Sequence, residues 1–142
     1  MMNDTRNVVV RYFDAWNSHN GYAIISSFID GGVYQDPIMT VQGEAIALYA
    51  QDLWTAFPDL YIEIINKFQA EQGDAIAIEW LMTGTNTGPI NGLSPTGKSI
   101  AVAGADIIKI VGNKISSVNG YFDSYALPKQ LGLQLLVQTE SN

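Results

Sequence analysis

The sequence contains no cysteine and only one histidine, His19, among its 142 residues. Without cysteine the chain can form no disulfide bond and can use no thiol in catalysis. With a single imidazole we expect no zinc or non-haem iron site, because such sites draw on histidine and cysteine ligands. His19 follows Ser18 in a polar segment, where neighbouring residues do not face each other, so we expect it to be a solvated surface side chain. The composition therefore predicts a protein that works without a metal or cofactor.

Basic residues and long apolar runs are scarce as well. The chain has 7 Lys and Arg against 14 Asp and Glu, a formal net charge of -7, which argues against nucleic acid or an anionic membrane surface as a partner. No apolar run is long enough to span a bilayer. The first residues, MMNDTRNVVV, lack the basic segment, apolar core and cleavage site of a signal peptide. We therefore expect a cytoplasmic protein.

What the chain does contain is typical of a globular protein. Hydrophobic residues make up 47% and charged residues 15% of the sequence, a balance that favours a packed core over disorder. The length suits one domain. We expect a single domain over residues 1–142, with 133–142 as a loose tail.

The first third of the chain shows mainly helical spacing. Apolar residues from Val8 to Trp16 predict a helix that begins near Asn3–Thr5. A second, short helix is expected over 22–29 and a third over 43–57, which Pro58 helps to end. Between them the sequence predicts a brief strand, 33–35, that ends at Asp36 because the residue before Pro37 is held extended.

From Leu60 onward the period changes to two, which indicates strands. We expect strands over 60–69, 75–87 and 100–110, then a tight Gly112-Asn113 turn, a strand that ends at Asp123, and a short helix over 124–131. Helices segregated from an antiparallel sheet define an α+β fold. We expect N-terminal helices packed on a curved sheet, which together form a cone with a pocket at its open end.

One short segment matches a nucleotide-binding motif. Residues 92–99, GLSPTGKS, fit the phosphate-binding loop pattern. In that motif a helix follows the last residue, and its N-terminal amides hold the phosphates. Here the following residues, SIAVAGADIIKIV, predict a strand, so we interpret the match as coincidental.

Asp106 is the strongest single candidate for chemistry. It shares a strand face with Ile100, Val102, Ile108 and Ile110, and a charged carboxylate in an apolar row is costly unless it is paired, protonated or at a cavity. A raised pKa would suit a proton donor or a general base. The alternative is a carboxylate satisfied by backbone amides at a bulge.

For three further groups of residues the sequence also leaves a functional and a structural interpretation open. Asp123, two residues after Tyr121 and expected on the same face, either joins Asp106 in a pocket or caps the following helix. Asp36 before Pro37 is either functional or part of a turn. Tyr12, Trp16, Trp54 and Trp80 are either plain core or the wall of a cavity, where their polar tips find partners.

Several short motifs, spread over nearly the whole chain, resemble the SnoaL-like polyketide cyclases, a family within the nuclear-transport-factor-two-like superfamily of cone-shaped folds. The motifs are Ala56-Phe57-Pro58-Asp59-Leu60, Gly84-Thr85-Asn86-Thr87-Gly88, Pro95-Thr96-Gly97-Lys98, Gly104-Ala105-Asp106, Gly112-Asn113-Lys114-Ile115, and Asp123 with Gln130-Leu131-Gly132.

The resemblance implies a cofactor-independent ring closure, in which an aspartate removes a proton next to a carbonyl and the carbanion attacks a second carbonyl. Asp123 matches the family's acid/base aspartate, with Asp106 beside it. The chain also has a more distant likeness to ketosteroid isomerases of the same fold, in which a protonated aspartate contributes to an oxyanion hole. That likeness implies instead that Asp36 takes the proton while Tyr12 and Asp106 hold the enolate oxygen.

We therefore expect a cyclase or isomerase in which Asp106, Asp123 and Asp36 carry the protons. Asn86, where many relatives have histidine, and Tyr121 are expected among the pocket residues with Tyr12 and the three tryptophans. The rival hypothesis is a binding module of the same fold without turnover. An epoxide hydrolase, which would need an arginine beside the aspartate, ranks lower because the only arginines, Arg6 and Arg11, lie on the first helix.

The expected partners are a small-molecule substrate or ligand and a second copy of the chain. The family resemblance implies a homodimer packed through the exposed sheet face. Close contact there would be allowed by Ala101, Ala103, Ala105 and Ile107.

Overall fold

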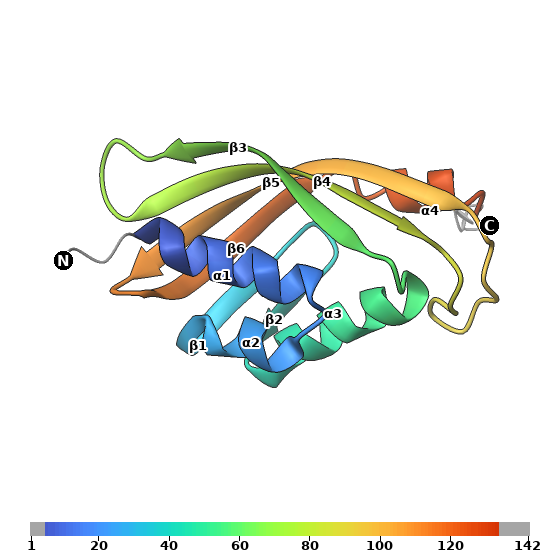
Figure 1. The fold of residues 1–142 in the computed structure, drawn as a ribbon, viewed down its shortest axis with the longest axis horizontal. Helices are drawn as coiled ribbons and strands as arrows, with labels where there is room; N and C mark the ends of the chain where they lie inside the picture. The colour runs from blue at the N-terminus through green and yellow to red at the C-terminus, as the bar shows by residue number, and fades with distance from the viewer. Residues whose placement is uncertain (1–4, 134–142) are drawn as a thin grey trace, which may run out of the picture.

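The computed structural model describes residues 5–133, which form one six-stranded sheet with helices packed against its concave face (Figure 1). The elements follow in the order α1 (Thr5–Asn17), α2 (Gly21–Ser26), β1 (Phe28–Gln35), β2 (Thr40–Gln42), α3 (Glu44–Ala56), β3 (Tyr61–Gln69), β4 (Ala75–Thr85), β5 (Ser99–Val111), β6 (Lys114–Phe122) and α4 (Ala126–Gln130).

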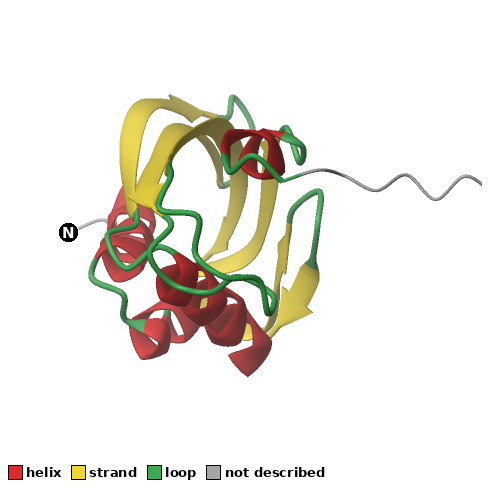
Figure 2. Cartoon of the chain, turned by 90° about the vertical axis from the view of Figure 1, so that its right-hand side faces the viewer, coloured by secondary structure: helices red, strands yellow, loops and turns green. Residues whose placement is uncertain are grey.

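The strands lie in the order β2-β1-β6-β5-β4-β3. Strand β1 runs parallel to β6, and every other neighbouring pair is antiparallel. Viewed along its length, the sheet bends around α1, α2 and α3 (Figure 2). This arrangement confirms the expected α+β cone, and it leaves the space between the sheet and the helices for the core and the site.

The core forms where the apolar stripe of each helix meets the inner face of the sheet. On α1, Val8, Val9, Tyr12, Phe13 and Trp16 are all buried, as their spacing predicts. They pack into one hydrophobic cluster with the buried residues of α3 and of strands β3 to β6. None of the helices within residues 5–133 is long and apolar enough to cross a membrane.

The region between α1 and α3 differs from the prediction. Helix α2 ends at Ser26, and residues expected to continue it belong to β1, which starts at Phe28. A glycine pair makes this possible, because Gly31 takes a φ of 76° and a Cβ on Gly32 would lie 2.9 Å from the Phe28 ring. The short edge strand β2 was not expected, and α4 is shorter than the predicted helix. Most of the predicted tail lies outside the described residues.

Two β-bulges change which side chains face the core. In β3 the pairing shifts between Ile64 and Asn66, and in β6 Ser116 is the extra residue, because Lys109 pairs with Ser117 while Ile110 pairs with Ile115. One extra residue reverses the alternation beyond it. As a result Phe68 is exposed, and so is Tyr121, which was expected on the same face as the pocket residues.

The loop between β4 and β5 is organised by Asn86, which is fully buried. Its side-chain amide donates to the carbonyl oxygens of Ala56, at 3.1 Å, and Gly88, at 2.9 Å. Its Oδ1 accepts from the backbone N–H and the hydroxyl of Thr96. Beyond this loop Ser99 begins a strand, so the phosphate-loop match lacks the helix that its mechanism needs, as expected.

Candidate active site

A cavity lies between the inner face of the sheet and the helices, at the end of the molecule where α4 sits. The cavity has a volume of about 70 Å³, whereas one water needs roughly 10–15 Å³. Side chains from α1, β1, α3, β3 to β6 and α4 line it, and most of them are aromatic or aliphatic. The polar groups that reach it include Tyr12, Tyr34, Asp36, Tyr49 and Asp106.

Asp106 lies at the centre of β5 with its side chain turned inward and only 6% exposed. It lines the cavity, and within residues 5–133 no group forms a hydrogen bond to its carboxyl. Burial raises the pKa of Asp106 to about 7. The neighbouring Trp80 indole N–H lowers that pKa in part, although it lies outside hydrogen-bond geometry here, and the charge of Asp36 raises the pKa again. At neutral pH this carboxyl is thus close to half protonated.

Asp36, directly after β1, is held quite differently. Its Oδ1 accepts hydrogen bonds from the backbone N–H groups of Ile38, at 2.8 Å, and Met39, at 2.9 Å. Its Oδ2 accepts from the hydroxyls of Tyr34, at 2.8 Å, and Tyr49, at 2.6 Å. The residue is therefore both a turn residue and a cavity residue, and the four donors fill the acceptor sites of its carboxylate.

Two donors that face the cavity have no partner. The Tyr12 hydroxyl and the Trp80 Nε1 are buried and make no hydrogen bond to any described residue. Burial raises the pKa of Tyr12 well above its ordinary value, and the Asp106 carboxylate raises it further. Tyr12 is consequently a neutral donor, and a buried donor left without a partner is costly. Oxygen atoms of a bound ligand would supply the acceptors that such donors need.

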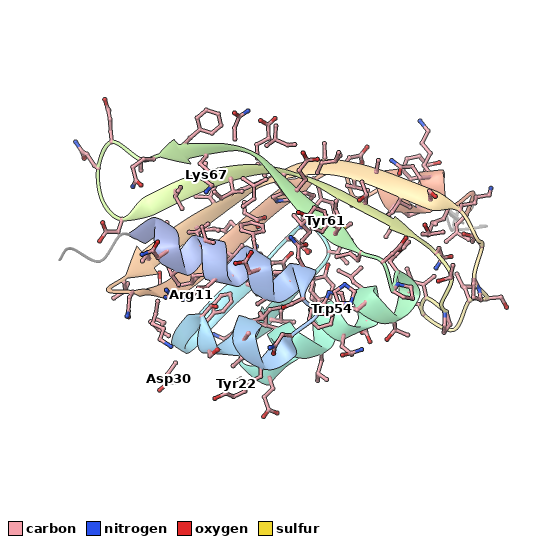
Figure 3. The ribbon with its side chains drawn as sticks, in the orientation of Figure 1. Arg11, Tyr22, Asp30, Trp54, Tyr61 and Lys67 are labelled. Carbon is pink, nitrogen blue, oxygen red and sulfur yellow. The ribbon has the colours of Figure 1, made fainter. Side chains whose placement is uncertain are left out.

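The cavity has an acidic and apolar character. No lysine, arginine or histidine of the described part of the chain lines it. Arg11 is exposed on the far side of α1, where its guanidinium donates to the Asn113 carbonyl at 3.5 Å (Figure 3). Within residues 5–133 no group of three or more Asp, Glu or His side chains is placed to hold a metal ion.

Five residues expected in the pocket line the cavity, namely Tyr12, Trp16, Asp36, Trp80 and Asp106. The other four expected residues do not.

Asp123 and Tyr121 lie outside the cavity. Asp123 is exposed just beyond the end of β6, and its Oδ1 accepts from the Tyr125 backbone N–H at 2.9 Å. Tyr121 is 59% exposed and lines a separate hollow beside Asp36 and Asn119. The bulge at Ser116 is the reason, because it turns the odd-numbered residues at the end of β6 outward. Asp123 is a turn residue before α4, a role similar to the helix cap that was the alternative expectation for it.

Trp54 and Asn86 belong to the packing of the molecule. Trp54, at the junction of α1 and α3 (Figure 3), packs edge-on against Trp16 with ring centroids 5.8 Å apart. The Trp54 ring also stacks on the His19 ring, with centroids 5.0 Å apart. His19 is therefore half-buried, in contrast to the solvated side chain that was expected. The His19 Nε2 lies 3.0 Å from the Leu60 carbonyl oxygen. The side-chain amide and Oδ1 of Asn86 are hydrogen-bonded within and around the loop after β4, so neither is free to bind a ligand.

Two important site residues, Tyr34 and Tyr49, were not predicted from the sequence. Tyr34 precedes Asp36 by two positions on an extended strand, which places both side chains on one face. Tyr49 belongs to the apolar stripe of α3, and only its polar tip distinguishes it from a core residue. The spacing of Tyr34 and Asp36 was a usable signal, whereas the contact of Tyr49 depends on the packing of α3 against β1.

Comparison with known proteins identifies the family. The family model described as SnoaL-like polyketide cyclase matches residues 6–131. No curated protein sequence matches the chain significantly. The fold is similar to those of two proteins named as candidate polyketide cyclases. One, from Jannaschia sp., has a TM-score of 0.77 at 18% identity, over 92% of this chain and 93% of its own. The other, from Xanthomonas campestris, has a TM-score of 0.79 at 16% identity, over 89% and 96%.

A third solved structure is a protein with a ketosteroid isomerase-like fold from Catenulispora acidiphila, determined in complex with trimethylamine. It has a TM-score of 0.77 at 24% identity and covers 92% of this chain and 96% of its own. At these identities the likeness establishes the fold alone, and the chemistry has to be argued from the residues of this cavity.

Proposed function

This chain belongs to the SnoaL-like polyketide cyclase family, and we propose that it is a cyclase or isomerase that forms an enolate from a small carbonyl compound by proton transfer to Asp106. The observation that carries the proposal is the buried Asp106 carboxyl, whose pKa of about 7 suits a general base at neutral pH. The cavity around it is mostly apolar, which fits a largely apolar substrate.

The proposed reaction needs no redox partner. The ionised Asp106 takes the proton from the carbon next to a substrate carbonyl, and the electron pair of the broken C–H bond moves into an enolate. The unpartnered Tyr12 hydroxyl donates a hydrogen bond to the oxygen where this charge develops. The enolate carbon then attacks a second carbonyl of the same molecule, and the resulting alkoxide recovers the proton from Asp106. In an isomerisation the proton returns to a different carbon.

Asp36 has a supporting role in this proposal, in contrast to the expectation that it takes the proton. Its two oxygens already accept four hydrogen bonds, so a base at this position would first have to lose a donor. Its negative charge instead contributes to the raised pKa of Asp106. Asp123 has no role in proton transfer here, because it lies outside the cavity.

The proposal can be tested by hydrogen exchange. A panel of ketones and β-keto esters is incubated with the protein in heavy water, and loss of the α-hydrogen signal is followed by NMR. We expect the wild type to accelerate exchange and Asp106→Asn to reduce the acceleration by about 10²–10⁴-fold, the usual contribution of a general base. Asp123→Asn, which removes an exposed carboxylate, is the matched control and should exchange like the wild type.

Two outcomes would oppose the proposal. Equal exchange in Asp106→Asn and the wild type would remove Asp106 from the reaction. A wild type that binds the carbonyl compounds but exchanges none of them would support the alternative of a binding module.

We also propose that two copies pair through the outer face of the sheet. Ala101 and Ala103 are exposed there, and the larger Tyr61 (Figure 3) and Phe68 are 54% and 57% exposed on the same side. Light scattering on the wild type should give the mass of a dimer, and Ala103→Glu should give a monomer; a monomeric wild type would refute the pairing.

A further inference from the structure

The charge of the cavity lining is unbalanced. Two carboxyl groups, Asp36 and Asp106, face a space that no basic side chain of residues 5–133 enters. Both side chains are buried, at 8% and 6% exposure, so water screens their charges poorly. The molecule as a whole adds to this field with a formal net charge of -7. An anionic ligand would meet repulsion here, and a cation would meet attraction.

The walls around these carboxyls suit one kind of cation. Aromatic rings surround the space, and a cation over the face of such a ring is attracted by its quadrupole, most strongly when water is excluded. The rings that line the cavity include those of Tyr12, Trp16, Tyr34, Tyr49, Trp80 and Phe122.

We propose that the cavity binds small organic ammonium compounds, with the Asp106 carboxylate as the counter-ion and the aromatic rings as the walls around the cation. This inference names a substrate class for the site described under Proposed function. It rests on the proposed function for the assignment of Asp106 as the reacting group. The binding itself needs no turnover and can be measured separately.

The unpartnered donors define the ligand further. The Tyr12 hydroxyl and the Trp80 N–H are buried without partners among residues 5–133, and an ammonium group has no lone pair to offer them. A ligand that satisfies the whole cavity therefore carries an oxygen as well as the cation, as an amino ketone or an amino alcohol does.

A bare metal ion fits the lining less well. Calcium takes six to eight oxygen ligands, and the oxygens of Asp36 are already occupied by two backbone N–H groups and two tyrosine hydroxyls. Only Asp106 and the tyrosine hydroxyls remain, among apolar walls. An organic cation needs fewer oxygens because it gains from the rings.

Binding of such a cation should depend on pH. The titratable groups that face Asp106 are Tyr12 on α1, Tyr34 and Asp36 on β1 and its end, and Tyr49 on α3; β3, β4, β6 and α4 contribute none to the cavity. The pKa values of Tyr12, Tyr34 and Tyr49 are raised, chiefly by burial, so these groups stay neutral. Asp106, with a pKa of about 7, changes charge between pH 6 and pH 8, and its ionised form attracts the cation.

The test compares choline with 3,3-dimethylbutan-1-ol, its uncharged isostere. Both carry the hydroxyl that could accept from Tyr12 and Trp80, so the pair isolates the charge. Calorimetric titration of the wild type at pH 8 should give choline an affinity at least about 10-fold higher, the lower end of the effect of a nearby opposite charge. From pH 8 to pH 6 the choline affinity should fall close to tenfold, as the ionised fraction of a group with a pKa of about 7 does. The affinity of the isostere should stay constant.

Two variants test whether Asp106 causes the preference for choline. Asp106→Asn should lose the preference for choline and its pH dependence, while Asp123→Asn, an exposed carboxylate outside the cavity, should keep both. Excess potassium chloride should compete weakly compared with tetramethylammonium chloride at the same ionic strength. If Asp106→Asn does not fold, the pH series and the comparison of choline with its isostere on the wild type still test the proposed ammonium site.

Equal affinities for choline and its isostere at pH 8, or unchanged preference in Asp106→Asn, would overturn the inference. The α-hydrogen exchange of neutral ketones is measured independently. Exchange without choline preference would leave the proposed reaction standing and reject the ammonium site, and choline preference without exchange would do the reverse.

Discussion

Asp36 and Asp106 approach each other across Gly120, at the inner side of β6. A Cβ placed on Gly120 would lie 3.0 Å from the Asp106 Oδ1 and 3.4 Å from the Asp36 Cβ. Since Gly120 has no side chain, these two acidic residues, one just after β1 and one on β5, share a space that any other residue would fill. The two carboxyl groups differ in their surroundings, because Asp36 accepts four hydrogen bonds and Asp106 accepts none from the described residues.

The raised pKa of Asp106 predicts a pH-dependent stability. Between about pH 4, the ordinary pKa of an aspartate, and pH 7, near its folded pKa, the folded chain keeps a proton that the unfolded chain has released. Stability therefore falls as the pH rises through this range, by as much as about 4 kcal/mol for a shift of three units. Urea unfolding at pH 4.5 and pH 8 should show a smaller fall for Asp106→Asn than for the wild type. Parallel pH profiles for the two proteins would contradict the assignment, and Asp123→Asn should follow the wild type.

Gly120→Ala should impair the site more than the fold. The added methyl group would press on the Asp106 Oδ1, and a displacement of about 1 Å near reacting groups can cost 10²-fold in rate. Gly84→Ala is the matched control, because its Cβ would meet the Phe57 Cβ at a similar 3.1 Å but away from the cavity. We expect α-hydrogen exchange to drop about 10- to 100-fold in Gly120→Ala alone, with a shifted pH profile. Similar exchange rates in the two variants would show that Gly120 does not position Asp106.

Tyr49→Phe should destabilise the protein. The Tyr49 hydroxyl donates to the Asp36 Oδ2 at 2.6 Å, and a hydrogen bond to a charged group contributes about 1.5–3 kcal/mol. The free energy of unfolding in urea at pH 7 should fall by that amount. In Tyr22→Phe the altered side chain is 81% exposed and protrudes from α2 (Figure 3); its effect should stay within about 0.5 kcal/mol. Equal stability of the two variants would mean that Asp36 does not depend on Tyr49.

Asn86→Asp should disturb the loop after β4 without touching the cavity. A carboxylate cannot donate to the Ala56 and Gly88 carbonyls. The Gly88 carbonyl loses this donor, at about 1–3 kcal/mol, whereas the Ala56 carbonyl still accepts from the Gly88 N–H at 3.2 Å. Thermal unfolding should show a clearly lowered midpoint, while Asn91→Asp, at an exposed site, should not. If choline binding below the midpoint were lost as well, Asn86 would have a role at the cavity that its contacts do not indicate.

Much of the fold could be predicted because the relevant signals are local. The stripe on α1, the period of two in β4 and β5, and the stop at Pro58 all depend on neighbours within a few residues. Strand β5 alternates without interruption from Ile100 to Ile110, so the inward position of Asp106 followed directly from counting.

The same counting failed where the strands bulge. In β6 the extra residue Ser116 reversed the faces of everything after it, so Tyr121 and Asp123 were assigned to the cavity while Gly120 and Phe122 occupy the inner positions. No single residue at this point marks a bulge, because the pairing with β5 decides where the extra residue is accommodated. The family resemblance reinforced the assignment of Asp123, since a motif match carries no information about the direction of a side chain.

The sequence by itself determined the helical and strand segments, the acidic balance of the chain and the placement of one carboxyl in an apolar row. The tertiary structure decided which residues surround that carboxyl. Asp36 and Tyr34 reach it from β1, Tyr49 from α3 and Tyr12 from α1, all of them far from Asp106 along the chain. The pKa of Asp106 is a property of this assembly, because desolvation and nearby charge act through space and cannot be read from neighbours along the chain.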